Sequence, residues 1–276
     1  MCRSRRELSN AYLLAKIGVD TAENEPLDVW GENSIQYSLH SLAGTLDGWR
    51  RPEDHTSYNG FLVRRPFHGR WDAHGADVEK FHARFQADRL ALTKRLAARA
   101  AVKETISSVA AVAEISALLR AAALPAALSE QIHSDACSLA GVVGAMYADR
   151  ELEVKLEVAS EKPCIRWHTD CFVGRTIVTY TGSKGTEYTS DCNVNFLELS
   201  SKKDNEQVIR DIKKVKSVDV GDILFMKGKY EQKYGHGGNP LVHRSPDPQY
   251  DEDGRFLRRL LLKVDVPLTD TERMME

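Results

Sequence analysis

Cysteine is scarce in this 276-residue sequence, and the cysteines do not follow the pattern of a disulfide-bonded protein. There are five of them, at irregular spacing: Cys2, Cys137, Cys164, Cys171 and Cys192. An odd number with irregular spacing argues against a disulfide framework. The pattern is typical of reduced, mostly buried thiols, so we expect an intracellular protein with the cytoplasm as its compartment.

Long apolar runs and an excess of one charge are also missing. The most apolar stretch, Ile106 to Leu128, contains Glu114, Arg120 and Pro125, which the interior of a bilayer would not accommodate. The formal net charge is only −2, which gives no general reason to expect a nucleic acid or a membrane surface as partner. The N-terminus shows no convincing signal-peptide cleavage site, although its composition leaves organelle targeting open.

Three regions differ in their sequence pattern, with boundaries near residues 76 and 150. Residues 1–76 show little periodicity beyond a short predicted strand at Phe61 to Val63. Residues 77–150 have the composition of a helical region, and residues 151–276 have the pattern of a β region that binds metal. We expect residues 77–276 to form one structural domain.

The helical region contains two predicted helices, separated by Pro125. The first extends from about Asp77 to Ala123, because alanine is abundant there and four apolar residues recur near helical spacing: Phe81, Phe85, Leu92 and Leu96. The second extends from Leu128 to Tyr147 and carries a single apolar stripe. We expect this stripe to pack against a sheet.

Beyond Arg150 the sequence changes to short runs that are typical of strands. The alternation over Leu152 to Val158 predicts a half-buried strand. Other runs of this kind follow, separated by turn residues: Cys164–Trp167, Val173–Tyr180, Asn193–Leu199, Ile223–Met226 and Leu257–Val264. The charged segment Ser200 to Ser217 is expected to be an exposed loop or short helix. The predicted fold class is therefore α+β: a C-terminal double-stranded β-helix (jelly roll) with an N-terminal helical region packed on it.

The segment from Ile165 to Asp170 is the strongest candidate for chemistry. If it is a strand, His168 and Asp170 project to the same face, about 7 Å apart along the backbone. His243 follows far enough along the chain for several strands to pass around a barrel before a third ligand arrives. Two histidines and one carboxylate are the donors of non-haem Fe(II) oxygenases, so these three residues are predicted to be metal ligands and catalytic residues.

The last predicted strand offers a site for a co-substrate. Enzymes of this type often bind the distal carboxylate of 2-oxoglutarate through a basic residue on that strand. Alternation places Arg258 on the apolar face with Leu260 and places Arg259 on the more polar face. We therefore predict that Arg258 is the carboxylate anchor; its alternative role is a structural ion pair, and that of Arg259 is a solvated charge. The hydroxyls of Thr179 and Tyr180 are weaker candidates for holding the same carboxylate.

A zinc site is the main alternative to iron. Cys164, His168 and Cys171 have a spacing that superficially resembles a structural zinc site. On a strand, Cys164 would lie roughly 13 Å from His168, and Cys171 would face away from Asp170. One tetrahedral ion could not collect these donors unless the strand is broken there. The identity of the metal at the predicted two-histidine, one-aspartate site stays open, because affinity alone does not select iron.

Several ordered motifs resemble the domain of unknown function 1826 family, over roughly Leu124 to Pro267. The segments that carry the resemblance are Cys164–Asp170, Thr179–Glu187, Val220–Gly228, Val242–Pro246 and Arg258–Leu262. The resemblance supports the placement of the three predicted ligands but implies no activity, because the family is largely uncharacterised. Some bacterial relatives occur alongside metal-handling GTPases, which implies a zinc-homeostasis role as an alternative. More distantly, the layout is similar to that of the Fe(II)/2-oxoglutarate-dependent dioxygenases.

The function expected from the sequence is that of a non-haem Fe(II)/2-oxoglutarate-dependent dioxygenase-like enzyme. Its cofactors would be Fe(II) and the co-substrate 2-oxoglutarate, and it would oxidise a small-molecule or other unidentified substrate. The alternative is a non-catalytic zinc-binding or homeostasis protein with the same fold. A third hypothesis is an interaction module in which the His/Asp cluster is vestigial. The sequence identifies neither the substrate nor the oligomeric state.

Overall fold

The computed structural model describes the chain mainly from residue 59 onward. The described residues are 59–63, 75–85, 90–97, 106–147, 150–159, 161, 163–201, 204–230 and 240–274. Most of the predicted N-terminal segment, residues 1–76, therefore lies outside the described residues. Within the described part, no helix is both long and apolar enough to cross a membrane.

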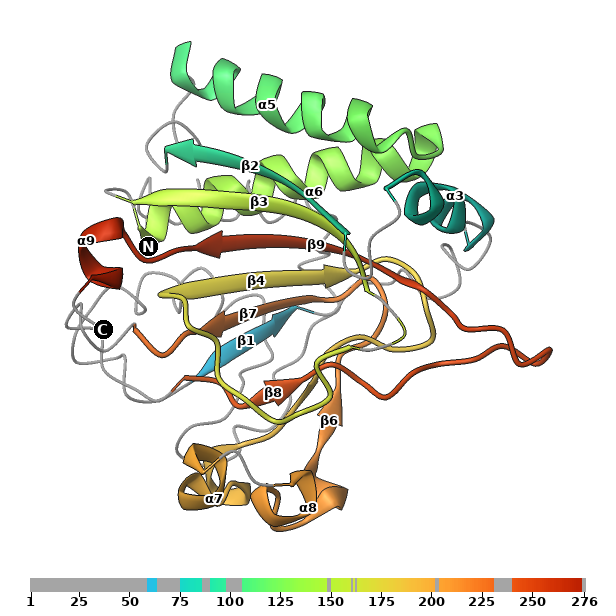
Figure 1. Cartoon of the computed structure of the whole chain (residues 1–276). Helices are drawn as coiled ribbons and strands as arrows, with labels where there is room; N and C mark the ends of the chain where they lie inside the picture. The colour runs from blue at the N-terminus through green and yellow to red at the C-terminus, as the bar shows by residue number, and fades with distance from the viewer. Residues whose placement is uncertain are drawn as a thin grey trace, which may run out of the picture.

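Helices and antiparallel strands both occur, as expected from the sequence (Figure 1). The strands are β1 Gly60–Val63, β2 Leu90–Ala97, β3 Glu151–Ala159, β4 Gly174–Thr179, β5 Glu187–Tyr188, β6 Lys216–Ser217, β7 Ile223–Lys227, β8 His243–Arg244 and β9 Arg259–Val266. The α-helices are α3 Gly75–Phe85, α5 Ile106–Ala122, α6 Ala126–Met146, α7 Phe196–Ser200, α8 Asn205–Val208 and α9 Asp270–Arg273. Two short 3-10 helices are η2 Asp191–Asn193 and η3 Ile212–Lys214.

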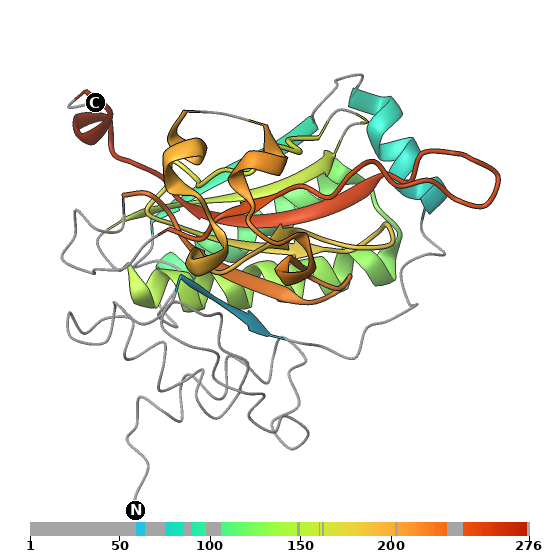
Figure 2. The ribbon, with the colours of Figure 1, turned by 90° about the horizontal axis from the view of Figure 1, so that it is seen from below.

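The described strands form two sheets. The larger one has six strands in the order β1-β7-β4-β9-β3-β2, and the smaller one has three in the order β6-β5-β8. An isolated antiparallel bridge between His168 and His243 extends the smaller sheet beyond β8. Figures 1 and 2 show α5 and α6 on one side of the strands and α7 and α8 on the other.

One face of the larger sheet packs against the long helices. The apolar residues of α6 that the sequence placed in one stripe, such as Leu128, Ile132 and Leu139, are fully buried there. They belong to the same hydrophobic cluster as the alternate residues of β3 and β9, such as Leu156 and Leu262. Each such side chain contributes roughly 1.5–3 kcal/mol when it is fully buried. The predicted helix and its packing on a sheet are confirmed.

The other face of this sheet is polar, yet it is also buried. Glu153 and Glu157 on β3 are only 7% and 5% exposed, so the prediction of a half-buried strand is wrong. The reason is that the smaller sheet and its loops cover this second face. Charged side chains therefore lie in the space between the two sheets.

The strand β2 corrects the prediction of a continuous helix from Asp77 to Ala123. Its leucines also fit a period of two, and the strand pairs along its whole length with β3, for example Leu92 with Leu156 and Leu96 with Leu152. Strand pairing in the tertiary structure thus outweighs the local helical propensity. The helical prediction holds for α3 and α5 on either side.

Two other predicted strands are not strands in the structure. Residues 164–167 are irregular, and residues 193–199 contain the end of a 3-10 helix and most of α7. In the second case, the Asn193 amide donates to Thr189 and its carbonyl oxygen accepts from the backbone of Asp211. Such local side-chain bonds compete with strand pairing. The predicted runs at 61–63, 173–180, 223–226 and 257–264 are confirmed as β1, β4, β7 and β9.

Tyr180 is a structural residue on the helix-facing side. Its hydroxyl donates a hydrogen bond of 2.5 Å to Oδ2 of Asp135 on α6, and both residues are fully buried. The prediction that Tyr180 helps to hold a co-substrate places it on the wrong face of the sheet. The error arises because residue 180 follows β4 in phase with Val178, which packs against the helices.

Replacing Tyr180 by phenylalanine should destabilise the fold. We expect Tyr180→Phe to lower the free energy of unfolding by about 1–3 kcal/mol, because the buried Asp135 carboxylate loses a donor. Urea unfolding followed by circular dichroism measures the change. Tyr250→Phe is the control, since this side chain is exposed and the loss of its hydroxyl should change stability by less than about 0.5 kcal/mol. Equal stability of Tyr180→Phe and the wild type would contradict the expectation.

Candidate metal centre

His168 and His243 are brought together by their backbones. The amide of His168 donates to the carbonyl of His243, and the amide of His243 donates to the carbonyl of His168, both at 3.0 Å. The two rings lie with their centroids 4.5 Å apart. The backbone carbonyl of Asp170, two residues further on, accepts a hydrogen bond of 2.8 Å from the amide of Lys229. The three predicted ligands therefore come from two segments that one β-bridge joins.

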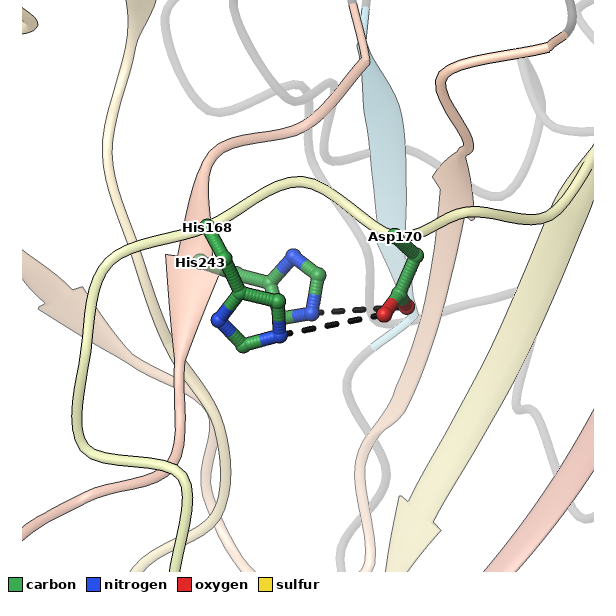
Figure 3. A group of neighbouring side chains, drawn as sticks. All are labelled: His168, Asp170 and His243. Carbon is green, nitrogen blue, oxygen red and sulfur yellow. Dashed lines mark ion pairs between the residues drawn. The ribbon is translucent and has the colours of Figure 1, made fainter. Parts of the chain in front are cut away.

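The donor atoms of the three side chains converge on one point (Figure 3). Nε2 of His168 lies 3.8 Å from Oδ1 of Asp170, and Nε2 of His243 lies 3.4 Å from Oδ2 of the same carboxylate. All three potential ligand atoms lie within 4.8 Å of one another. His243 and Asp170 are buried, whereas His168 is half-buried and forms the accessible side of the cluster.

The outer ring nitrogens show how the donors are arranged. Nδ1 of His168 lies 2.8 Å from the carbonyl oxygen of Arg166, and Nδ1 of His243 lies 3.0 Å from that of Leu241. A carbonyl oxygen can only accept, so each Nδ1 carries a hydrogen, and the neutral form of each ring would present its Nε2 lone pair to Asp170. Two lone pairs and a carboxylate facing one another repel unless a cation or a proton lies between them. The donor set thus fits a divalent metal ion.

The surroundings of the cluster favour a neutral His168 and an ionised Asp170. Burial lowers the pKa of His168, and the neighbouring His243 lowers it further. Burial raises the pKa of Asp170, but His243 and Arg175 outweigh this effect and hold the pKa well below its usual range. A neutral imidazole and an ionised carboxylate are the forms that bind a metal.

A chain of ion pairs connects Asp170 to the larger sheet. Arg175 on β4 donates to Oδ2 of Asp170 at 2.7 Å and to both oxygens of Asp265 on β9, at 2.6 and 2.9 Å. Asp265 also lies 3.3 Å from Nζ of Lys155, which in turn lies 2.7 Å from Glu153. These five residues carry three negative charges and two positive ones. This network was not predicted from the sequence, because the polar faces of these strands were expected to face solvent.

A cavity of about 390 Å³ adjoins the cluster and lies between the two sheets. Its lining includes both histidines and four charged residues from the larger sheet: Glu157, Arg175, Arg259 and Lys263. Lys263 is paired with both oxygens of Glu157, at 3.0 and 3.1 Å. In the described part of the chain, the side chain of Arg259 makes no hydrogen bond or ion pair, although it is only 5% exposed. Burial lowers the pKa of Arg259 to about 10, against the opposing effect of Glu157 and Glu187.

Arg258, which was predicted to anchor the co-substrate, does not line this cavity. Its Nε donates to Glu79 on α3 at 2.7 Å, and its side chain lines a separate cavity of about 720 Å³. Strand β9 has two buried faces, and its apolar face packs against the helices rather than toward the cluster. Thr179 is likewise not among the residues that line the cavity beside the cluster. Its side chain is buried, with its hydroxyl next to Gly185. Basic and acidic residues alternating along β3 and β9 were the signal that could have indicated Arg259.

Cys164 lies much closer to His168 than the predicted strand geometry implies. Sγ of Cys164 lies 3.8 Å from Nδ1 of His168, not roughly 13 Å away, because the segment is irregular rather than a strand. The sulfur approaches the ring nitrogen that faces away from Asp170, and Cys171 is exposed. Among the described residues, His168, Asp170 and His243 are the one group of three whose donor atoms converge.

Comparison with known proteins identifies the family. Residues 70–265, more than half of the chain, match the family model described as a protein of unknown function (DUF1826). The chain belongs to this family. No curated protein matches it significantly.

Several solved structures are similar to this member of the DUF1826 family. Dioxygenase for auxin oxidation 1 from Arabidopsis thaliana, solved with 2-oxoglutarate, is 11% identical with a TM-score of 0.47, and the match covers 88% of this chain and 95% of that one. A full-length protein from Neurospora crassa, solved in complex with α-ketoglutarate, is 11% identical with a TM-score of 0.37, covering 81% and 78%. The Fe(II)/α-ketoglutarate-dependent dioxygenase TqaL is 11% identical with a TM-score of 0.40, covering 96% and 90%.

The ring of His168 provides a direct test of the arrangement. In metal-free protein we expect its titration midpoint to lie below the ordinary value of 6.5, because burial and His243 disfavour the imidazolium. Above that midpoint the hydrogen should be on Nδ1. Long-range ¹H–¹⁵N correlation spectra over a pH series measure both properties, and His168→Gln assigns the signal. A midpoint above 6.5, or a neutral ring with its hydrogen on Nε2, would contradict the arrangement.

Proposed function

We propose that this DUF1826 protein is a non-haem Fe(II)/2-oxoglutarate-dependent dioxygenase-like enzyme that oxidises a small molecule. One observation carries the proposal: two imidazoles and a carboxylate converge beside a cavity lined by a buried arginine that has no hydrogen-bond or ion-pair partner among the described residues. The first feature suits a divalent metal, and the second suits an anionic ligand next to it.

The two sheets support a double-stranded β-helix as the fold. Along the chain, the segments alternate between the sheets: β3, the segment at His168, β4, β5 and β6, β7, β8 and β9. In the larger sheet the strands lie in the order β3-β9-β4-β7, and in the smaller one the order is His168 segment-β8-β5-β6. This winding brings the His168 segment next to β8, so that His168 and His243 both line the cavity.

His168, Asp170 and His243 would hold the metal through Nε2, a carboxylate oxygen and Nε2. Three protein ligands leave the remaining positions of an Fe(II) ion available, and bound iron would supply the O₂-dependent oxidation chemistry. The chain itself fixes the tautomer of each histidine through a backbone carbonyl and keeps Asp170 ionised. The accessible side of His168 faces the cavity, where a ligand can approach.

Arg259 is the best candidate to anchor the distal carboxylate of 2-oxoglutarate. Arg175 and Lys263 also line the cavity, but each already pairs with carboxylates. The ion-pair network that ends at Asp170 has one net negative charge. Adding a divalent metal and the charge of Arg259 gives the site a net charge of two positive. A dianionic 2-oxo acid would balance them, with its keto-acid end at the metal and its other carboxylate at the guanidinium.

Metal loading and turnover test the proposal. With Fe(II) and 2-oxoglutarate under anaerobic conditions, we expect a weak visible absorption band, and on admission of O₂ we expect succinate to form. Both signals should disappear in His168→Ala and persist in His133→Ala, a histidine on α6 outside the site. Stoichiometric zinc, with neither signal when iron is supplied, would instead favour the zinc-homeostasis alternative.

A pair of adjacent arginines tests the anchor. Arg259→Gln should raise the KM for 2-oxoglutarate by about 30-fold to 150-fold, since a hydrogen bond between charged groups contributes about 2–3 kcal/mol. Arg258→Gln should leave this KM within about 2-fold of the wild type, because Arg258 pairs with Glu79 beside a different cavity. Succinate formation at varied 2-oxoglutarate concentration measures both. The opposite pattern would return the anchor to Arg258.

A further inference from the structure

The guanidinium of Arg175 is shared between the cluster and the centre of the larger sheet. Nη1 donates to Oδ2 of Asp170 at 2.7 Å, while Nε and Nη2 donate to the two oxygens of Asp265 at 2.6 and 2.9 Å. All three nitrogens are thus used, and the side chain is only 9% exposed. The other carboxylate oxygen of Asp170, Oδ1, lies 3.8 Å from Nε2 of His168, and Oδ2 itself lies 3.4 Å from Nε2 of His243.

The position of Arg175 is itself fixed by its surroundings. Arg175 and Asp265 are direct partners in the pairing of β4 with β9, so their side chains leave the sheet at the same level and on the same face. The ring of Phe172 lies against the guanidinium, with its centroid 4.2 Å from Cζ. A two-point ion pair and a stacked ring hold a planar guanidinium far more strictly than a single contact would.

We propose that Arg175 is the positioning residue of the metal centre. By holding Oδ2, it fixes the orientation of the Asp170 carboxylate toward Nε2 of the two histidines. Asp170 lies on an irregular segment, and a short side chain on such a segment can otherwise rotate and offer both oxygens. Because Arg175 is itself held by Asp265 on β9, its hydrogen bond to Asp170 restrains the carboxylate of that ligand. The inference rests on the proposed metal site and is independent of the co-substrate.

Two effects of Arg175 on metal binding oppose each other and must be separated. Its positive charge repels a nearby cation, whereas its hold on Asp170 preorganises a ligand. Asp265 neutralises the charge at close range, so the positional effect should dominate. The double variant Arg175→Gln/Asp265→Asn isolates this effect, because it removes one positive and one negative charge together. It also avoids leaving the buried carboxylate of Asp265 without its arginine, which would be strongly destabilising.

The experiment uses Co(II) alone as the probe, on full-length protein. We expect Arg175→Gln/Asp265→Asn to bind Co(II) about 10-fold to 100-fold more weakly than the wild type and with an altered visible spectrum. Arg175→Lys should recover part of the affinity and of the spectrum, because one donor and the charge are retained. Arg150→Gln is the matched control: Arg150 is also 9% exposed and pairs with Glu272 at 2.8 Å, next to β3 and outside the cavity lining. It should leave both readouts unchanged.

The outcomes separate this inference from the proposed function. Wild-type protein that binds no Co(II) would overturn the metal site and the positioning role together. Wild-type binding with an unchanged affinity and spectrum in the double variant would overturn the positioning role alone and leave Arg175 with a structural one. If the double variant does not fold, Arg175→Lys decides: a spectrum and an affinity identical to those of the wild type would likewise overturn the proposal.

Discussion

Two backbone hydrogen bonds, exchanged between His168 and His243, are the contact on which the candidate site depends. They join an irregular segment to a strand that follows it far along the chain, and they set the two imidazoles side by side. Each ring then donates from Nδ1 to the carbonyl two residues before it. Backbone geometry alone thus determines which nitrogen of each histidine faces Asp170, before any metal binds.

The second constraint is the burial of charge between the two sheets. Removing charged groups from water costs several kcal/mol for each ion unless a partner compensates. Most of the charged residues on this face are compensated: Lys263 by Glu157, and Arg175 by two carboxylates. Arg259 lacks a partner in the described part of the chain, and this is why it is the strongest indication of an anionic ligand.

Sequence patterns predicted the elements whose burial follows a simple rule. The stripe on α6 and the runs of β4, β7 and β9 needed only local information, whereas the alternation in β3 predicted the strand but not the burial of its charged face. The convergence of His168 and Asp170 was predicted from strand geometry. The segment is irregular rather than a strand, yet the two side chains do converge. Arg258 was preferred to Arg259 because one buried face was assumed for each strand. In a fold of two stacked sheets with helices outside, a strand such as β9 has two buried faces. The face with charged side chains lies toward the cavity, and the apolar face lies toward the hydrophobic core.

The number of protein ligands bears on the choice between iron chemistry and zinc storage. A structural zinc site is closed by four protein donors and commonly forms only as the chain folds around the ion. The converging group in the described residues has three donors, and its accessible side opens into a cavity that also contains Arg259. A protein that only stored the ion would gain nothing from leaving a buried guanidinium unpaired next to it. An enzyme that binds an anionic co-substrate at the metal would use both features, and this is the physical reason to favour the oxygenase.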